Sequence, residues 1–316
     1  MAKDNGGAIA QKGFNYQNYV ISLVAIRNYT KDNFSIYVEA DDDFEVMYDD
    51  NYHAYIQVKG QKLSINKLLQ KTKNKPSIFE KHLSSGDNNS VFKIVVFNFT
   101  ESDLKMMKIQ IDNEELFSKS WGLSNEQKST INRILDGVEL KLNNFSLVKT
   151  EFDNNSDCAR KFLTGELVDH KISVDGRNDI ILNELMNIIQ QKSEIIISSD
   201  DDKELKRIQA SQLNLILKKV TSKARFDDEL KKLNFTTIKM EKIKKEECKI
   251  IITYNSIKKK IIDFLNCDKT KLETNHLVTL IPDIINLDIM NDLDENTKYA
   301  IIISAYCDIL EGIANE

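Results

Sequence analysis

Residues 36–59 read IYVEADDDFEVMYDDNYHAYIQVK, and this stretch decides how the rest of the chain is interpreted. Two runs of alternating apolar and polar residues, 43–48 and 54–59, flank a polar loop at 49–53. This pattern predicts a β-hairpin that follows a strand and an acidic turn. The apolar side chains of both runs share one parity and so face a common core. The polar face carries Asp43, Glu45, Gln57 and Lys59.

The polar face of this hairpin suits a metal site. If the hairpin is symmetric about Asn51, Asp43 lies opposite Lys59 and Glu45 lies opposite Gln57, with Cβ atoms about 5 Å apart. Mg²⁺ prefers hard oxygen ligands, and one or two carboxylates suffice to hold it. A lysine beside it can orient a water molecule or stabilise charge on phosphorus, as phosphodiester hydrolysis requires. An exposed hairpin face without any catalytic role carries the same kinds of residue and is the alternative interpretation.

The composition indicates a globular protein with one large domain or two ordinary ones. The chain has 316 residues, of which 41% are hydrophobic and 29% charged. We expect a cytoplasmic protein without a membrane segment, because the sequence has no long apolar run and no signal-peptide pattern at its start. The formal net charge of −5 argues against a permanent coat on nucleic acid. The four cysteines are far apart, which indicates neither a zinc site nor a disulfide framework.

The remaining pattern predicts helices with a few further strands. Residues 1–13 are expected to be a flexible entry, and residues 14–29 a helix. The apolar run 91–99 predicts a strand buried on both faces, which a helical crossover could place parallel to one of the first three strands. Further helices are predicted at 65–73 after Ser64, 76–82, 158–168 and 297–313, and a polar helical region at 101–143. A further strand is predicted at 145–149. Residues 178–234 are predicted to be helical, with an interruption at 198–203 by a loop and a new helix start.

Several of these motifs together resemble a known nuclease superfamily. Gln57-Val58-Lys59, preceded by Asp41-Asp-Asp-Phe-Glu45, resembles the last motif of PD-(D/E)xK nucleases in the variant of the Mrr-like restriction endonucleases. The glycine pair at 6–7 and the stretch Gly13-Phe14-Asn15-Tyr16-Gln17 are similar to the start of one subgroup. That subgroup comprises nuclease domains of CD-NTase-associated effectors in CBASS anti-phage defence. Similar domains serve in Lamassu systems and in other defence systems with an SMC-like ATPase.

The resemblance implies an α/β fold with a restriction-endonuclease-like core, which consists of a helix, a three-stranded meander, a helix and a strand, and a mainly helical C-terminal region. It implies a DNA endonuclease that depends on Mg²⁺, with Mn²⁺ as a substitute. Either Asp43 or Glu45 could be the main metal ligand. The implied catalytic residues are Asp43, Glu45, Gln57 and Lys59, the first three also as metal ligands, with Gln17 and Glu39 as accessory residues and Lys71, Lys73 and Lys75 as DNA contacts.

The chain is expected to divide into a nuclease domain at 1–170, a helical extension at 171–235, and a helical region at 236–316 that oligomerises or docks to a partner. The last boundary follows a change in charge, because 238–260 is rich in lysine and 283–316 is acidic. A free nuclease would be toxic, so we expect a restraining partner, such as an SMC-like ATPase, or activation by oligomerisation. The alternative is a non-catalytic DNA-binding or scaffold subunit of an SMC/ABC-ATPase defence complex.

Overall fold

The structure is a computed structural model that describes residues 5–49, 51–72, 75–110, 116–172, 177–267, 272 and 274–313. It confirms a mixed α/β protein. The described residues divide into two compact units: the first holds those up to 172 together with 178–213, and the second holds residue 177 and those from 214 onward. The three functional segments expected from the sequence remain a prediction.

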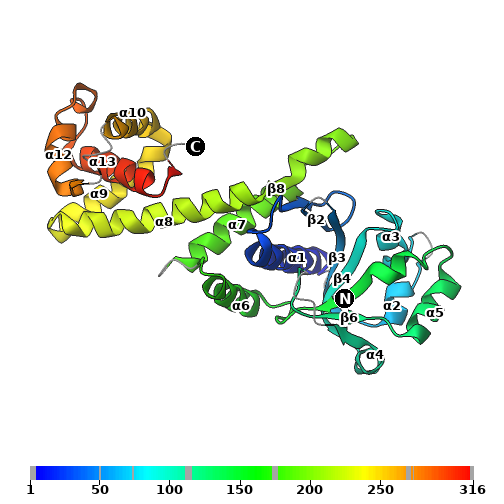
Figure 1. The fold of residues 1–316 in the computed structure, drawn as a ribbon. Coiled ribbons are helices and arrows are strands. Elements are labelled where there is room, and N and C mark those ends of the chain that lie inside the picture. Colours follow the sequence, from blue (N-terminus) through cyan, green and yellow to red (C-terminus); the bar gives the residue numbers. More distant parts are fainter. Residues whose placement is uncertain are drawn as a thin grey trace. The chain divides into compact units, whose positions relative to one another are not determined.

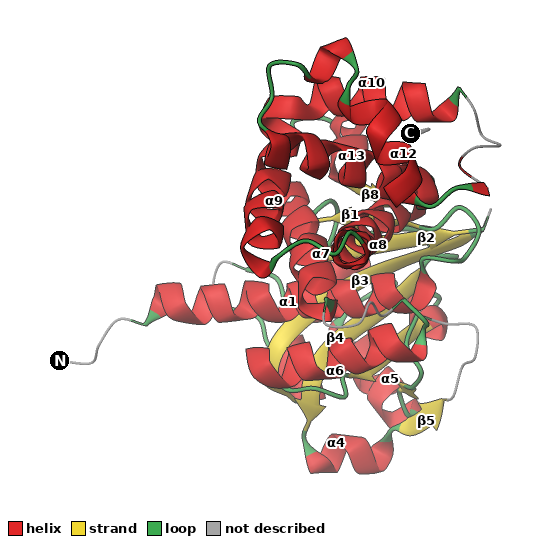
Figure 2. Ribbon diagram, turned by 90° about the vertical axis from the view of Figure 1, so that its left-hand side faces the viewer, coloured by secondary structure: helices red, strands yellow, loops and turns green. Residues whose placement is uncertain are grey.

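The first unit is built on one eight-stranded sheet. Its strand order is β5-β6-β7-β4-β3-β2-β1-β8, with β5 near one end and β8 at the other (Figure 2). The β3–β4 and β4–β7 pairs are parallel, and the remaining pairs are antiparallel. The strands are β1 (Ser35–Val38), β2 (Phe44–Tyr48), β3 (Tyr52–Leu63), β4 (Val91–Phe99), β5 (Lys108–Gln110), β6 (Ser120–Gly122), β7 (Phe145–Lys149) and β8 (Arg207–Gln209).

Helices cover both faces of this sheet. Figure 1 shows α1, α6 and α7 on one side of it and α2, α3 and α5 on the other. The order α1-β1-β2-β3-α2-α3-β4 confirms the predicted sequence of elements, and the predicted parallel pairing of 91–99 is confirmed by the β3–β4 ladder. The helical elements of this unit are α1 (Gly6–Asn28), α2 (Ile65–Leu69), α3 (Ile78–Ser84), α4 (Glu101–Met106), α5 (Asn125–Ile134), η1 (Lys141–Asn144), α6 (Ser156–Asp169), α7 (Asn178–Ser193), η2 (Asp200–Lys206) and the start of α8 (Ala210–Lys232).

Helix α1 is longer than predicted, because its first two turns replace the expected flexible entry. Its second half is anchored by side chains such as Tyr16 and Val20, which are completely buried. A helix that is already nucleated extends at little cost, since each further residue adds one hydrogen bond. The alanines, glutamine and lysine at 8–12 have good helix propensity, which offsets the glycines at this end.

The strands that the sequence pattern missed are three residues long. Residues 101–143 contain β5 and β6 as well as α4 and α5, so the prediction of a helical region there was wrong in part. Strand β8 lies within the region predicted as helix and pairs with β1. Such short strands show no periodicity, and their pairing partners are distant in sequence, as with Trp121 beside Leu147. The run at 198–203 leads into a 3₁₀ helix, where Ser199 and Asp202 form a capping box.

The second unit is helical and has its own core. Helix α13, predicted from the apolar run 297–313, is buried there, and Ile301, Ile302 and Ile303 are inaccessible to solvent. None of the helices among the described residues has the length and apolar character needed to cross a membrane. The elements of this unit are most of α8, then α9 (Thr237–Lys249), η3 (Ile250–Tyr254), α10 (Asn255–Asn266), α12 (Leu277–Ile285), η4 (Asp288–Met290) and α13 (Glu295–Leu310).

Candidate active site

The hairpin of β2 and β3 presents its apolar residues to the core as predicted. The side chains of Phe44, Val46 and Ile56 are completely buried. Their alternation with polar residues fixes which face of the hairpin is polar, because a slip by one residue would expose the whole apolar set. The predicted polar residues therefore come from the opposite parity of the same two strands.

The register of the hairpin differs from the prediction by two residues. Glu45 pairs with Tyr55 and not with Gln57, and the same shift means that Asp43 is not directly opposite Lys59. The rings of Tyr48 and Tyr52 are stacked at the end of the hairpin, with centroids 4.1 Å apart. This aromatic pair stabilises the observed register, because cross-strand aromatic contacts contribute to the stability of a sheet.

Asp43 and Lys59 nevertheless come together. Asp43 lies one residue before β2, where its side chain is free to turn toward β3. Its Oδ2 accepts a hydrogen bond of 2.7 Å from the backbone N–H of Val58 and lies 3.3 Å from the ammonium nitrogen of Lys59. Both side chains keep some contact with solvent, at 14% and 28% exposure. A carboxylate and an ammonium group thus meet at a position that a phosphate can reach.

The predicted accessory residues lie beside this pair. The amide of Gln17, on α1, donates to the carboxylate of Glu39 at 2.6 Å and to the backbone carbonyl of Asp43 at 3.3 Å. Glu39 has a left-handed backbone with φ of 52° and begins the turn that ends at Asp43. Burial raises the pKa of Glu39, Gln17 opposes this, and the negative charge of Asp43 raises the pKa further. The two carboxylates are therefore close enough to repel, which a bound cation would relieve.

Gln57 is almost completely buried on the same strand as Lys59. Its amide nitrogen has no hydrogen-bond partner among the described residues. A buried amide that lacks a partner is costly, so its position calls for an explanation. Among the described residues, Gln57 is not one of those that line the cleft around Asp43 and Lys59, so its role as a ligand stays a prediction.

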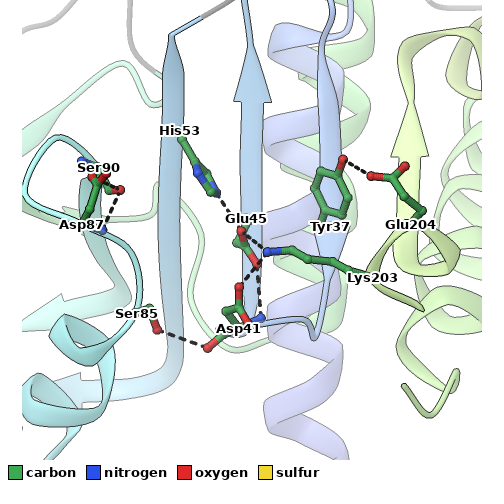
Figure 3. A network of polar contacts seen from close by, with 9 residues as sticks. All are labelled: Tyr37, Asp41, Glu45, His53, Ser85, Asp87, Ser90, Lys203 and Glu204. Atoms are coloured by element: carbon green, nitrogen blue, oxygen red, sulfur yellow. Dashed lines mark hydrogen bonds and ion pairs between the residues drawn. The ribbon is translucent and has the colours of Figure 1, made fainter. Parts of the chain in front are cut away.

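Glu45 belongs to a different group of residues. Its carboxylate is completely buried, 2.7 Å from His53 Nε2 and 2.9 Å from the ammonium of Lys203, and it also accepts from the backbone N–H of Asp41 (Figure 3). Burial would raise the pKa of Glu45, but the hydrogen bonds from His53 and Lys203, with the charge of Lys203, lower it overall. These contacts leave Asp43, and not Glu45, beside Lys59.

A cleft of about 700 Å³ surrounds the Asp43–Lys59 pair. One wall is the exposed face of α1, and another is the end of β3, where the ladder with β4 shifts its register between Lys59 and Lys62. Lys12 and Lys62 also line this cleft, as does Asp153. The lysines of the lining would attract a phosphate backbone, and its carboxylates would attract a cation.

The lysines predicted to contact DNA do not line this cleft in the part of the chain that the structure describes. Lys71 forms an ion pair of 2.9 Å with Glu80, and Lys75 forms a backbone bridge with Thr72. Lys73 lies outside the described residues. Lys62 was missed because the irregularity of the ladder between Lys59 and Lys62 breaks the alternation on which the prediction rested.

The donor groups fit a Mg²⁺ ion that keeps several water ligands. Asp43 and Glu39, which both line the cleft, would supply hard carboxylate oxygens. Within the described residues, no three His, Cys, Asp or Glu side chains form a cluster that could hold a metal ion by themselves.

Comparison with known proteins shows the family to which the chain belongs. Residues 5–193 match the family described as Cap4, dsDNA endonuclease domain. The chain is 37% identical over 295 residues to Lamassu protein LmuA from Bacillus sp. (strain NCIM 5461 / CCTCC AB 2011126 / NIO-1130), covering 89% of this chain and 92% of that protein. No solved structure matches the chain. The chain belongs to the family of Cap4 dsDNA endonuclease domains, as a nuclease of the Lamassu and CBASS type.

Proposed function

We propose that this protein is a metal-dependent endonuclease that cuts double-stranded DNA as the effector of an anti-phage defence system. The observation that carries the proposal is the 3.3 Å approach of Lys59 to Asp43 within a cleft that also holds Glu39. The proposal includes a PD-(D/E)xK type of site, in which Gln57 takes the place of the usual acidic residue. The matching family of DNA endonuclease domains supports the reaction class.

The residues of the site divide the work of phosphodiester hydrolysis. Asp43 and Glu39 would hold Mg²⁺, or Mn²⁺ in its place, with Gln57 as a further oxygen donor. When bound, the ion lowers the pKa of a coordinated water and polarises the phosphate. Lys59 orients the attacking water and stabilises the negative charge that develops on the phosphate oxygens. Lys12 and Lys62 attract the DNA backbone into the cleft through charge.

The second unit is proposed to restrain or activate the nuclease. The similarity to Lamassu protein LmuA covers more of the chain than the first unit contains, so it extends into the helical residues after 213. We propose that this part docks to another defence subunit, such as an SMC-like ATPase, or forms a homo-oligomer. A restrained state explains how the cell tolerates a DNA endonuclease before infection.

The alternative is a subunit that keeps the nuclease fold but only binds DNA or scaffolds a complex. Such a subunit has no need for a carboxylate and an ammonium group at 3.3 Å in an accessible cleft. The retained pair therefore favours the enzyme. An enzyme and a binding subunit differ in the effect that they predict for a substitution of Lys59.

Digestion of a supercoiled plasmid with Mg²⁺ tests the proposal. The protein is assayed alone and in complex with its partner subunits, because a restrained nuclease can be inactive alone. We expect Lys59→Ala to lower kcat about 10³-fold or more, since it removes charge stabilisation in the transition state. Lys62→Ala is the matched control: it removes the same charge from the same cleft and should mainly weaken DNA binding. Equal cutting by Lys59→Ala and wild type, or no cutting by any assembly, would contradict the proposal.

A further inference from the structure

The three consecutive aspartates at 41–43 each have a basic partner from a different element. Asp43 contacts Lys59 of β3, while Asp42 is bound by His82 and Asp41 by Lys203. We propose that His82 and Lys203 are positioning residues, which fix Asp42 and Asp41 so that the carboxylate of Asp43 faces Lys59. This inference rests on the proposed function, because it assigns its role to Asp43 as a ligand in the active site.

His82 is linked to Asp43 through the side chain of Asp42. Nδ1 of His82 is bonded to Oδ2 of Asp42, and both side chains are sealed from solvent, at 0% and 1% exposure. The other carboxylate oxygen of Asp42 accepts a 2.9 Å hydrogen bond from the backbone N–H of Asp43. His82 therefore orients a carboxylate that in turn holds the backbone of the predicted metal ligand.

The ring of His82 is itself held in place. Phe92 and Phe145 contact it edge to face, with ring centroids 5.6 and 6.3 Å away. Helix α3, which carries His82, begins at a capping box formed by Ser77 and Glu80. These contacts hold the ring, so the position of Asp42 depends on β4, β7 and α3 as well as on its own turn.

Lys203 holds the other side of the turn. Its ammonium group lies 2.7 Å from Asp41 and 2.9 Å from Glu45, and Figure 3 shows it between these two carboxylates. The backbone carbonyl of Asp41 also accepts from the hydroxyl of Ser85, beyond the end of α3. Lys203 comes from η2, so a segment far along the sequence fixes the acidic turn to β2.

The turn needs such contacts because it lies outside the regular ladder. Residues 39–43 connect β1 and β2, and Glu39 has a left-handed backbone that strand pairing does not impose. A displacement of about 1 Å at a reacting group can lower a rate about 100-fold. Partners one shell away from metal ligands typically change metal affinity or activity about 10- to 100-fold when they are removed.

The test uses the full chain and compares His82→Leu, Lys203→Met and the conservative variant His82→Asn. In His82→Asn the amide nitrogen replaces the ring Nδ1–H as the donor to Asp42. Three quantities are measured: the affinity for Mn²⁺ alone by calorimetry, the hydrogen exchange of residues 39–45 without metal, and kcat and KM for plasmid cutting. Lys67→Met, an exposed charge change on α2, is the matched control.

We expect His82→Leu and Lys203→Met to weaken Mn²⁺ binding about tenfold or more, and to speed exchange at residue 43. They should lower kcat and leave KM for DNA near the wild-type value, and His82→Asn should restore most of the loss. A folded His82→Leu with wild-type Mn²⁺ affinity and exchange overturns the proposal. If His82→Leu does not fold, Lys203→Met decides by the same criteria, since its side chain is partly exposed.

The two proposals fail in different ways. A wild-type protein that cuts no DNA in any assembly would contradict the proposed function. The Mn²⁺ affinities and exchange rates would still report whether His82 and Lys203 position Asp43. Conversely, if Lys59→Ala abolishes cutting while the His82 and Lys203 variants bind Mn²⁺ as wild type, the nuclease stands and the positioning roles do not.

Discussion

Asp43 and Glu45 are two positions apart, yet they serve different groups of residues. Glu45 lies within β2, so the pleat of the strand directs its side chain toward His53 and Lys203. Asp43 precedes the strand and bonds to the backbone of β3, which brings it to Lys59. The alternation of polar and apolar residues identifies the polar face of the hairpin. It does not show which polar residues lie within the paired strand and which lie just before it.

Lys203 is the residue that sequence patterns could not connect to this site. It lies 158 positions after Glu45, within an acidic run that predicts a solvated helix start. The ammonium group that compensates the buried Glu45 is therefore specified by the tertiary structure alone. By contrast, Gln57 and Lys59 followed from the alternation of a single strand, and Gln17 from a short motif within α1.

Glu45→Gln should reduce stability in a pH-dependent way. The folded state lowers the pKa of Glu45, so the stability that its charge contributes is present above the unfolded pKa of about 4.3 and is lost as the pH falls through the folded value. At pH 7 we expect a loss of about 2 kcal/mol in the free energy of unfolding, because Lys203 and His53 lose a buried partner.

Urea unfolding of both proteins at pH 7 and at pH values down to about 3 measures this difference. The gap in the free energy of unfolding between wild type and Glu45→Gln should narrow as the pH falls through the lowered pKa of Glu45 in the folded wild type. A gap of the same size at both pH values would show that the charge of Glu45 does not stabilise the fold.

At the scale of single elements, strand β3 carries the site on an irregular segment. The ladder to β4 shifts its register after Lys59, and Gly60 stands at this shift. The side-chain amide of Asn154 donates to the carbonyl of Gly60 at 2.7 Å. A Cβ atom at position 60 would lie 2.5 Å from the Asn154 nitrogen, so the strand accepts only glycine here without a rearrangement.

Gly60→Ala is therefore expected to impair cutting more than stability. Displacement of Asn154 costs about 1 kcal/mol of stability for a lost hydrogen bond. The neighbouring Lys59 shifts with the strand, and kcat should fall about tenfold or more. Gly165→Ala, within α6 and with no atom near the added Cβ, is the matched control. It should raise the free energy of unfolding by about 1 kcal/mol, because alanine has the better helix propensity, and leave kcat unchanged.

Long periodic elements were predictable and short ones were not. Residues 91–99 and 145–149 form the strands expected from their apolar runs, and Ser64 caps α2 as predicted. The predicted register of the hairpin was wrong because a shift by two residues leaves every side chain on the same face, so periodicity does not distinguish the two registers. Strands β5, β6 and β8 are specified by distant partners rather than by their own three residues.

At the scale of the whole molecule, each of the two units has buried apolar residues of its own. One core lies between the sheet and α2, α3 and α5, and includes Ile94, while the helical unit has its own core around Ile302. The similarity to LmuA extends over both units, although the residues that identify the nuclease all lie in the first. The short stretch Gly13–Gln17 was informative because Tyr16 anchors α1 to Thr150 while Gln17 enters the site.

Substitutions in the two cores should act locally. Ile302→Ala creates a cavity in the helical unit and should cost about 2–5 kcal/mol of that unit's stability. Hydrogen exchange should quicken in α9, α10 and α13 and stay at wild-type rates in β3 and β4. Ile94→Ala, equally buried in the first unit, should give the opposite pattern. Equal acceleration in both units for either variant would show that the two cores unfold as one.

The central claim is that the cleft at Asp43 and Lys59 is the nuclease active site, with Asp43 rather than Glu45 as the principal metal ligand. Its most direct test is Mg²⁺-dependent plasmid cutting by Asp43→Asn and Glu45→Gln in the same activated assembly at pH 7, with folding verified for each. We predict that Asp43→Asn lowers kcat about 10³-fold or more, while Glu45→Gln keeps at least about a tenth of wild-type activity. A folded Asp43→Asn that cuts as wild type, or an inactive folded Glu45→Gln beside an active Asp43→Asn, would contradict the account.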